Sequence, residues 1–282
     1  MTIGKLIYNT IFKPTSSFRY NINHFGLFGY IRILMGETKM KKAALSLPSI
    51  ELRDDFDLEV NFLTGSKYWH QTIFCGYTLA TTLQNKVKIN FYSDGTLSLK
   101  HIGRIQSILK KSNFISEAKV VENLLETLPQ ANFPVLHSLR KWHPFFRRLI
   151  DIHINQEWAL HLDSDMLFFS KPYELIHAFK NKNALYMKEL MDNSYYADSE
   201  KNLEEKYDII CSKNVNGGIV AYNGTEINYQ DLELKAKILL QNYPNAGAAQ
   251  IEQTLMGYIL NEQNAVPLDD NFYQIIYEDT FF

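Results

Sequence analysis

The sequence predicts an α/β fold in which a mainly parallel central sheet is flanked by helices. Apolar stretches of strand length alternate with longer stretches whose apolar residues recur every three to four positions. Polar turn residues follow several of the predicted strands, and ligands of parallel sheets bind at that edge. The 282 residues, of which 46% are hydrophobic and 21% charged, suffice for a large folded core.

The first half of the main domain alternates most regularly. Strands are predicted over 58–63, 87–92 and 119–121, and helices over 67–84 and 98–111. Ser98 is of the residue type that caps a helix N-terminus. Thr64 and Gly65 end the first strand, and Asp94 lies in the turn after the second. A further helical region is broken at Pro134 and Pro144.

The most informative stretch begins with a predicted buried strand over residues 158–162. Asp163 and Asp165 follow it, and residues 166–169 are apolar again. An unpaired buried charge costs several kcal/mol, so these acids either lie at the strand's end or hold a cation. Residues two apart in a strand point to the same side. Asp163 and Asp165 would then converge on one Mg²⁺ or Mn²⁺ ion, which prefers oxygen ligands.

The second half is less regular. A helix is predicted over 172–179, a strand over 184–187, a surface excursion over 192–207, a turn and strand over 214–223, and helices over 231–242 and 248–260. Gly217 and Gly218 either admit a ligand close to the backbone or form a β-bulge. In the last helix Glu252 flanks the apolar face and Gln253 points away from its centre, as ordinary polar surface residues do.

Residues 1–48 form a predicted basic N-terminal arm. They carry seven Lys or Arg and one Glu, a net charge of +6, which leaves −8 for the rest of a chain whose total is −2. The apolar segment 25–35 is too short to cross a bilayer. The arm either packs on the main domain as a helical arm or makes a peripheral contact with an anionic membrane. Nothing in the total charge calls for nucleic acid as a partner.

The chain has only two cysteines, Cys75 and Cys211, which lie far apart in the sequence. A structural disulfide is not expected, and a reducing cytoplasm is the default compartment. With the basic arm, the expected location is cytoplasmic, with a peripheral contact at the inner face of the membrane.

Three stretches together resemble a known family: Leu-Asp-Ser-Asp-Met-Leu-Phe-Phe at 162–169, Asn-Gly-Gly-Ile at 216–219 and Ile-Glu-Gln-Thr-Leu at 251–255. Their order and spacing resemble the nucleotide-sugar glycosyltransferases of GT-A fold, especially bacterial relatives of glycosyltransferase family 8. The resemblance spans about residues 55–280 and implies a GT-A domain over 49–282, expected to continue past the last residue.

The resemblance implies a metal-dependent hexosyltransferase. Such an enzyme moves a sugar from a nucleotide-diphosphate sugar to a hydroxyl group of a glycan or lipid-linked acceptor, in cell-surface polysaccharide biosynthesis. A divalent ion would stabilise the departing diphosphate as a Lewis acid. The sequence leaves open whether the transfer retains or inverts the sugar's configuration.

The resemblance also implies roles for individual residues. Asp163 and Asp165 would hold Mn²⁺ or Mg²⁺ and with it the donor diphosphate. Glu252 and Gln253 would line the reaction centre. The remaining donor-binding residues would be Thr64, Gly65 and Asp94 at the nucleoside, Arg147 or Arg148 at the phosphates or sugar, Ser164 between the two acids, and Asn216, Gly217 and Gly218 at the donor sugar.

One departure from the family concerns the metal site, which a histidine near the C-terminus commonly completes. None of the eight histidines follows His177. Either a C-terminal segment is missing, or Asp269, Asp270 or Asp279 supplies an oxygen ligand, or activity is lost.

Other classes compete with this interpretation. A catalytically silent nucleotide-sugar-binding relative fits the absent histidine. A phosphatase of the haloacid dehalogenase type also uses an Asp-x-Asp pair, but near its first strand. A nucleotidyltransferase needs a Gly-rich basic loop, of which residues 64–67 are a poor version. A final alternative is that the acids cap a following helix.

Overall fold

The structure is a computed structural model that describes residues 13–190 and 195–276 and divides into two units, Met1–Leu47 and Pro48–Phe282. In the first unit, helix α2 (Lys13–Ser46) is interrupted at Gly26, whose φ is +70°. Glycine adopts this left-handed conformation without the steric cost that a side chain brings. Across the interruption, the ring of Phe18 packs edge-on against Tyr30 at 5.7 Å.

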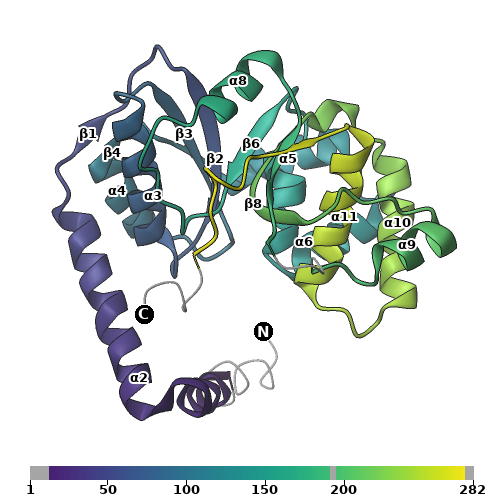
Figure 1. Cartoon of the computed structure of the whole chain (residues 1–282), viewed down its shortest axis with the longest axis horizontal. Helices are drawn as coiled ribbons and strands as arrows, with labels where there is room; N and C mark the ends of the chain where they lie inside the picture. Colours follow the sequence, from purple (N-terminus) through teal and green to yellow (C-terminus); the bar gives the residue numbers. More distant parts are fainter. Residues whose placement is uncertain (1–12, 191–194, 277–282) are drawn as a thin grey trace. The chain divides into compact units, whose positions relative to one another are not determined.

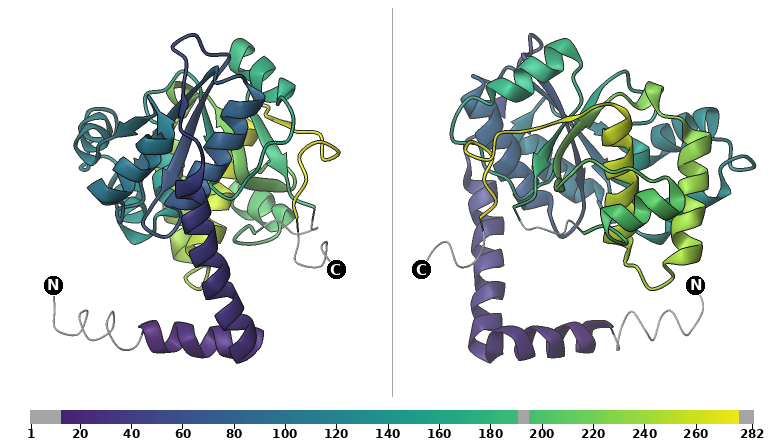
Figure 2. Two further views of the ribbon diagram at one scale, coloured as in Figure 1. Left: turned by 90° about the vertical axis from the view of Figure 1, so that its left-hand side faces the viewer. Right: turned by 45° about the vertical axis from the view of Figure 1, so that its right-hand side comes forward.

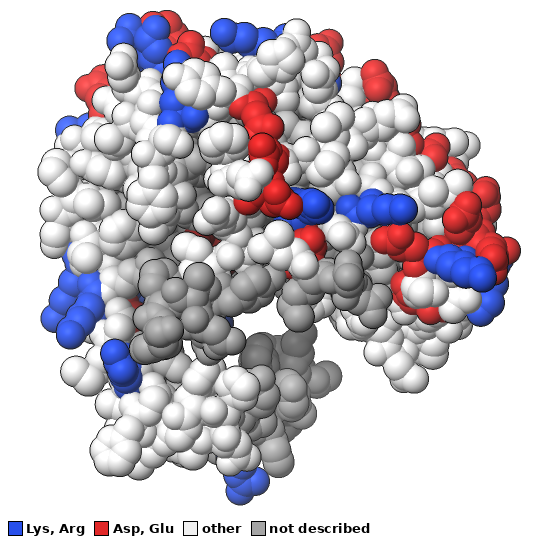
Figure 3. Space-filling view, in the orientation of Figure 1, with Lys and Arg blue, Asp and Glu red and all other residues white. Residues whose placement is uncertain are grey.

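Among the described residues, no helix combines the length and the apolar character that a membrane crossing requires. The apolar side chains of α2 are nevertheless exposed: Phe28 is 87% exposed and Met35 is 56% exposed. Figure 3 shows that the surface of α2 is largely uncharged, with a few Lys and Arg side chains along it.

The second unit is built on a seven-stranded sheet (Figure 1). Its order is β5 (Asn113–Ile115), β3 (Val87–Ser93), β2 (Leu58–Thr64), β6 (Ala159–Leu162), β8 (Val215–Tyr222), β7 (Leu185–Lys188) and β9 (Val266–Pro267). The first four strands are parallel, and β8 runs antiparallel to both of its neighbours. Two short strands, β1 (Ile50–Glu51) and β4 (Leu109–Lys110), pair in parallel outside this sheet. The prediction of a mainly parallel sheet flanked by helices is confirmed.

Helices cover both faces of the sheet. Helix α3 (Trp69–Thr82) packs on the face that carries Ile89, and α4 (Leu99–Ile108) packs on α3. Helix α5 (Glu117–Thr127) and the π-helical turn η2 (Arg148–Ile152) pack against Leu63 and Tyr92 on the other face. These residues lie on opposite faces because side chains alternate along a strand.

The remaining helices surround the β8 side of the sheet, as the two views in Figure 2 show. They are α6 (Pro134–Trp142), α7 (Phe145–Arg147), α9 (Glu200–Tyr207), the 3₁₀ turn η3 (Gly224–Glu226), α10 (Tyr229–Asn242) and α11 (Ala248–Glu262). Helix α8 (Tyr173–Asn181) is the exception and packs on β2. Helix α11 packs directly on β8, and α10 packs on both α11 and α6.

Two sequence predictions are wrong. Residues 119–121, predicted as a strand, lie in α5, because the Ser116 hydroxyl caps the helix by accepting from the Lys119 N–H at 3.3 Å. Val120 and Leu124 then fall on one buried helical face. The third strand is the preceding segment, β5. The predicted excursion over 192–207 contains α9, while residues 192–194 lie outside the described part of the chain.

The strand order reverses at one edge of the sheet. The chain passes from β2 to β3 on one side, then returns to place β6 on the other side of β2. In such folds ligands bind outside the carboxyl ends of the strands, at the point where the strand order reverses. Thr64, Asp94 and Asp163 all lie at this edge, at or just after the ends of β2, β3 and β6.

Candidate active site

The paired acids lie in a turn that directly follows β6. The strand is buried at every position and ends at Leu162, so the acids sit beyond the strand and the alternation of side chains along it does not set their direction. The Asp163 N–H still donates to the Gly218 carbonyl at 2.7 Å. Between the acids, the buried Ser164 hydroxyl shares a 2.9 Å hydrogen bond with Thr72 of α3. The turn is therefore anchored on both β8 and α3.

The two acids have different surroundings. Asp163 accepts from the Nη1 of Arg148, with 3.1 Å to Oδ1. The Asp165 side chain is exposed to solvent and forms no ion pair with any residue that the structure describes. Partial desolvation and the neighbouring charge of Asp163 raise the pKa of the Asp165 carboxyl. Asp165 is thus the carboxylate left without a protein cation, and a metal ion would relieve both of those effects.

Arg148 connects Asp163 to a second, fully buried carboxylate. The guanidinium binds Glu252 of α11 in a bidentate pair, Nε to Oε1 at 2.8 Å and Nη2 to Oε2 at 2.9 Å. Burial raises the pKa of Glu252, although the charge of Arg148 offsets part of that rise. Burial alone would lower the pKa of Arg148, but Glu252 and Asp163 outweigh it and raise the value. Asp165 adds a third carboxylate nearby without pairing to Arg148, so these three carboxylates and one guanidinium carry a net charge of −2 when all are ionised.

The adjacent Arg147 belongs to a different part of the site. Its Nη1 pairs with Glu117 of α5 at 2.8 Å and donates to the Ser93 carbonyl at 3.3 Å. The sequence left open which arginine serves the donor. The structure brings Arg148 to the paired acids and Arg147 to the loop after β3.

The predicted nucleoside residues meet at the ends of β2 and β3. The Asp94 N–H donates to the Thr64 carbonyl at 2.9 Å, and its carboxylate accepts from the N–H and hydroxyl of Thr96. A Cβ at Gly65 would lie 2.0 Å from Oδ2 of Asp94. Only glycine therefore lets the two loops approach this closely.

The Asn-Gly-Gly segment of β8 packs against protein groups. The register between β7 and β8 shifts between Tyr186 and Met187, which fits the β-bulge interpretation of Gly217 and Gly218. A Cβ at Gly217 would lie 3.0 Å from Nη2 of Arg148. One at Gly218 would lie 2.5 Å from the Met166 methyl. Asn216 donates to Glu189 and accepts from the Gly218 N–H.

The polar pair on α11 is buried, contrary to the expectation of a polar helix surface. Glu252 is fully inaccessible and Gln253 is 7% exposed. The Gln253 amide donates to the Val215 carbonyl of β8. The burial of Glu252 could have been predicted from the local sequence, because Ala248, Met256 and Ile259 share its side of the helix. Its partner Arg148 lies 104 residues away, and no local pattern points to it.

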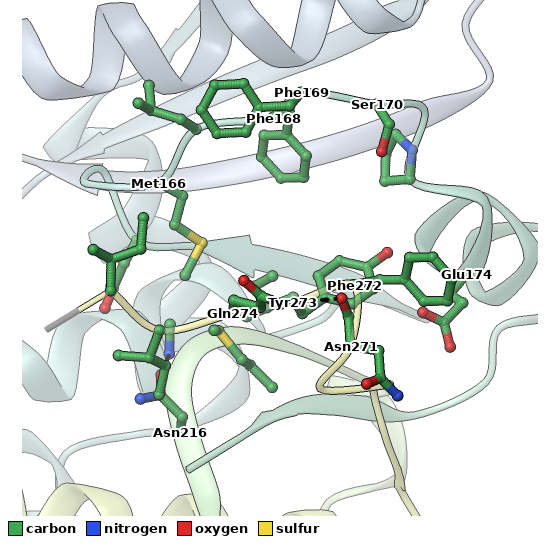
Figure 4. Close-up of a pocket in the computed structure, with 18 of the residues that line it drawn as sticks. Met166, Phe168, Phe169, Ser170, Glu174, Asn216, Asn271, Phe272, Tyr273 and Gln274 are labelled. Carbon is green, nitrogen blue, oxygen red and sulfur yellow. Dashed lines mark hydrogen bonds between the residues drawn. The ribbon is translucent and has the colours of Figure 1, made fainter. Parts of the chain in front are cut away.

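A cavity of about 1100 Å³ opens beside the paired acids (Figure 4). Asp163, Asp165, Asn216 and Gly218 line one end of it. Its walls are residues 166–174 and 271–276, of which the sequence analysis singled out none as a site residue. The sequence feature that could have pointed to these walls is the pair of aromatic residues at 168–169 and at 272–273, in segments that show neither a helical nor a strand period.

The residues present fit a divalent ion that arrives with its substrate. The described chain contains no group of three or more His, Cys, Asp and Glu side chains arranged to hold a metal. Mg²⁺ is usually bound in proteins by one or two carboxylates together with substrate phosphates and water, and Asp163 and Asp165 supply those carboxylates. The alternative ligands are engaged elsewhere: Asp269 accepts from Asn271, and Asp270 pairs with Lys188. Asp279 lies outside the described residues.

Comparison with known proteins gives matches among solved structures. Neither a protein-family model nor a curated protein sequence matches the chain. An active-site mutant of the galactosyltransferase LgtC is 14% identical, over 76% of this chain and 73% of LgtC, with a TM-score of 0.50. Mouse xyloside xylosyltransferase 1 is 12% identical over 83% and 91% of the two chains (TM-score 0.49). The S. cerevisiae mannosyltransferase Ktr4p is 11% identical over 84% and 78% (TM-score 0.47).

The likeness to LgtC shows a shared fold. It confirms the GT-A fold that the sequence resemblance implied.

Proposed function

We propose that the chain is a metal-dependent glycosyltransferase that moves a sugar from a nucleotide-diphosphate sugar to a hydroxyl of a glycan or lipid-linked acceptor, in cell-surface polysaccharide synthesis. The observation that carries this proposal is the pair Asp163 and Asp165. They directly follow β6, at the edge where the strand order reverses, and Asp165 has no cationic partner among the described residues. The fold shared with LgtC supports it.

The charges around the pair suit a diphosphate that carries a divalent ion. Two negative charges are uncompensated around Arg148, and an Mg²⁺ or Mn²⁺ ion would balance them. When bound, such an ion stabilises negative charge on the departing diphosphate. In the transfer, the acceptor oxygen bonds to the anomeric carbon and the bond from that carbon to the diphosphate breaks. The electron pair leaves with the diphosphate, and the hydroxyl proton goes to the diphosphate or to solvent.

The buried side of the site positions the reacting groups. Because Glu252 holds one edge of the Arg148 guanidinium through two hydrogen bonds, Arg148 has a fixed orientation toward Asp163 and the donor sugar. Glu252 is engaged in this ion pair, so its role is to position Arg148. Gln253 has its amide N–H on β8, which leaves its carbonyl oxygen as the group that would meet the sugar.

We assign the donor nucleoside to the ends of β2 and β3, on the other side of the candidate site from Arg148. Thr64, Gly65 and Asp94 form a hydrogen-bonded pair of loops there. Arg147 lies next to these loops, where it adds positive charge close to the donor phosphates. Ser164, Asn216, Gly217 and Gly218 shape the space between the two edges.

The test is calorimetric binding of a panel of nucleoside diphosphates and their sugars, with and without Mn²⁺. We expect binding by at least one member to require Mn²⁺ and to weaken about 100-fold or more in Asp165→Asn, since the metal carries the diphosphate. The matched control is Asp54→Asn, an exposed acid at the opposite edge of the sheet, which should bind like the unmodified chain. Unchanged binding in Asp165→Asn would refute the metal assignment.

Turnover separates the alternatives. Formation of glycosylated product, or slow hydrolysis of the bound sugar nucleotide, supports a transferase. Binding without either reaction identifies a silent relative. Hydrolysis of an aryl phosphate without nucleotide binding identifies a phosphatase.

We also propose that α2 makes a peripheral membrane contact at the cytoplasmic face. Leu27, Phe28, Ile31, Leu34 and Met35 recur at helical spacing and are exposed, and Arg32, Lys39, Lys41 and Lys42 add positive charge. Such a helix lies in the interface of an anionic bilayer. Phe28→Ser should reduce co-sedimentation with phosphatidylglycerol vesicles and not change the poor binding to phosphatidylcholine vesicles. If the unmodified chain and Phe28→Ser co-sediment equally with phosphatidylglycerol vesicles, the membrane contact is contradicted.

A further inference from the structure

The cavity beside the paired acids has chemically different ends. Asp163 and Asp165 mark one end, whereas the walls farther from them are mostly hydrocarbon. Twelve of the 21 described residues that line the cavity are apolar or aromatic. Figure 4 shows Phe168 and Phe169 on one wall and Phe272 and Tyr273 on the other.

Two of the polar side chains in the wall formed by residues 271–276 already have protein partners. Asn271 donates to Asp269, and Gln274 donates to the Asn271 carbonyl. At the acidic end, both polar atoms of Asn216 are engaged, one with Glu189 and one with Gly218. A glycan buried along these walls would leave hydroxyl groups without partners, which costs free energy for each group. Most of the surface that these walls offer a ligand is therefore hydrocarbon.

Several large side chains in the walls are strongly exposed. Phe169 is 84% exposed, Phe272 is 78% exposed and Tyr173 is 72% exposed. The wall that carries Phe169 is also tied to the fold, because the Phe168 N–H donates to Thr78 of α3 at 3.1 Å. A group of exposed aromatic residues on anchored backbone marks a binding surface.

We propose that this cavity is the acceptor subsite and that it binds the apolar chain of a lipid-linked acceptor, with the acceptor hydroxyl at the end formed by Asp163 and Asp165. This assignment rests on the proposed glycosyltransferase function. The exposed apolar residues of α2 supply an independent reason, because an enzyme held at a membrane meets acceptors that are anchored in it. The ligand class is a sugar or phosphate head group on an acyl or isoprenoid chain.

The test compares two glycosides with the same head group, methyl maltoside and n-decyl maltoside, the latter below its micelle concentration. Calorimetry on the full chain should show decyl maltoside binding about 100-fold or more tightly than methyl maltoside, because each buried methylene contributes to binding. The double variant Phe169→Ser/Phe272→Ser should lose most of that difference. Both residues are largely exposed, so the variant should keep its melting temperature.

Two control variants locate the effect. Leu99→Ser removes an equally exposed side chain, 86% accessible, from α4 and should leave the chain-length preference unchanged. Phe28→Ser removes an exposed side chain from α2 and should also leave the chain-length preference unchanged. A preference that survives the cavity variant, or that disappears in Phe28→Ser, would overturn the proposal by assigning the apolar chain to another surface.

Nucleoside diphosphate binding with Mn²⁺ is measured on the same samples, so the two proposals fail separately. Metal-dependent nucleotide binding without any preference for decyl maltoside would refute the apolar acceptor subsite alone. A preference that depends on Phe169 and Phe272 without any nucleotide binding would refute the transferase, and with it the assignment of this cavity to an acceptor.

Discussion

The two edges of the candidate site are built from different interactions. At the ends of β2 and β3, Thr64, Gly65 and Asp94 are held by hydrogen bonds to backbone groups and hydroxyls in partly exposed loops. At the ends of β6 and β8, the groups are held by charge: Arg148 joins Asp163 to a carboxylate that has no solvent access.

Two adjacent arginines make the contrast direct. The partner of Arg147 is Glu117, whose side chain is 48% exposed, whereas the partner of Arg148 is Glu252, whose side chain is fully buried. A solvated pair contributes little to stability, but a buried charge that loses its partner is costly. The stability of the β6–β8 edge therefore depends on its ion pair far more than the stability of the β2–β3 edge does.

The largest expected effect is that of Glu252→Ala. It leaves the Arg148 guanidinium buried without its bidentate partner, so the free energy of unfolding should fall by about 3–5 kcal/mol. Urea denaturation measures this, with Glu117→Ala as the matched change at the neighbouring arginine. Glu117→Ala should cost less than about 1 kcal/mol, because the Glu117 side chain is 48% exposed and Asp151 still lies beside both of its arginine partners, Arg140 and Arg147. Equal losses in the two variants would contradict the contrast between the edges.

The fold was predictable because local periodicity carries it. The apolar stretches of β2, β3, β6 and β8 were each located from the sequence to within a few residues. The prediction for 119–121 failed because two adjacent valines suggest a strand, while the decisive feature was the capping hydroxyl of Ser116.

The candidate site was predictable only in part. Asp163 and Asp165 are recognisable because acids interrupt an apolar stretch, and that signal is local. The pairing of Arg148 with Glu252 joins distant parts of the chain, and the choice between Arg147 and Arg148 depends on the direction in which each side chain leaves the junction of α7 and η2. The walls of the cavity were missed because residues 166–174 and 271–276 meet only in the folded chain.

A smaller effect is expected at the β2–β3 edge from Gly65→Ala. The new Cβ would lie 2.0 Å from the Asp94 carboxylate, so Asp94 must leave Thr96 to make room. The cost should be about 1–3 kcal/mol, as for other overpacked positions. In an Asp94→Ala background the same substitution should cost at least about 1 kcal/mol less, because the clash is gone. A thermal-denaturation cycle over the four proteins measures this coupling, and an equal cost in both backgrounds would show that Asp94 is not the obstacle.

The smallest effect concerns the pH dependence of Glu117. Partial burial alone would raise the pKa of this carboxyl, but hydrogen bonds and charges from Arg140 and Arg147 outweigh burial and hold it below its usual value. A depressed carboxyl pKa stabilises the fold above the unfolded-state value of about 4.3, and that stabilisation is lost as the pH falls through the folded-state value. Glu117→Gln should therefore be less stable than the unmodified chain at pH 7 by less than about 1 kcal/mol, since the side chain is half exposed. The difference should shrink to nothing as urea titrations are repeated below about pH 4. A difference that stays constant with pH would mean that Glu117 acts through packing, and the β2–β3 edge would then resemble the buried edge more closely than its exposed charges suggest.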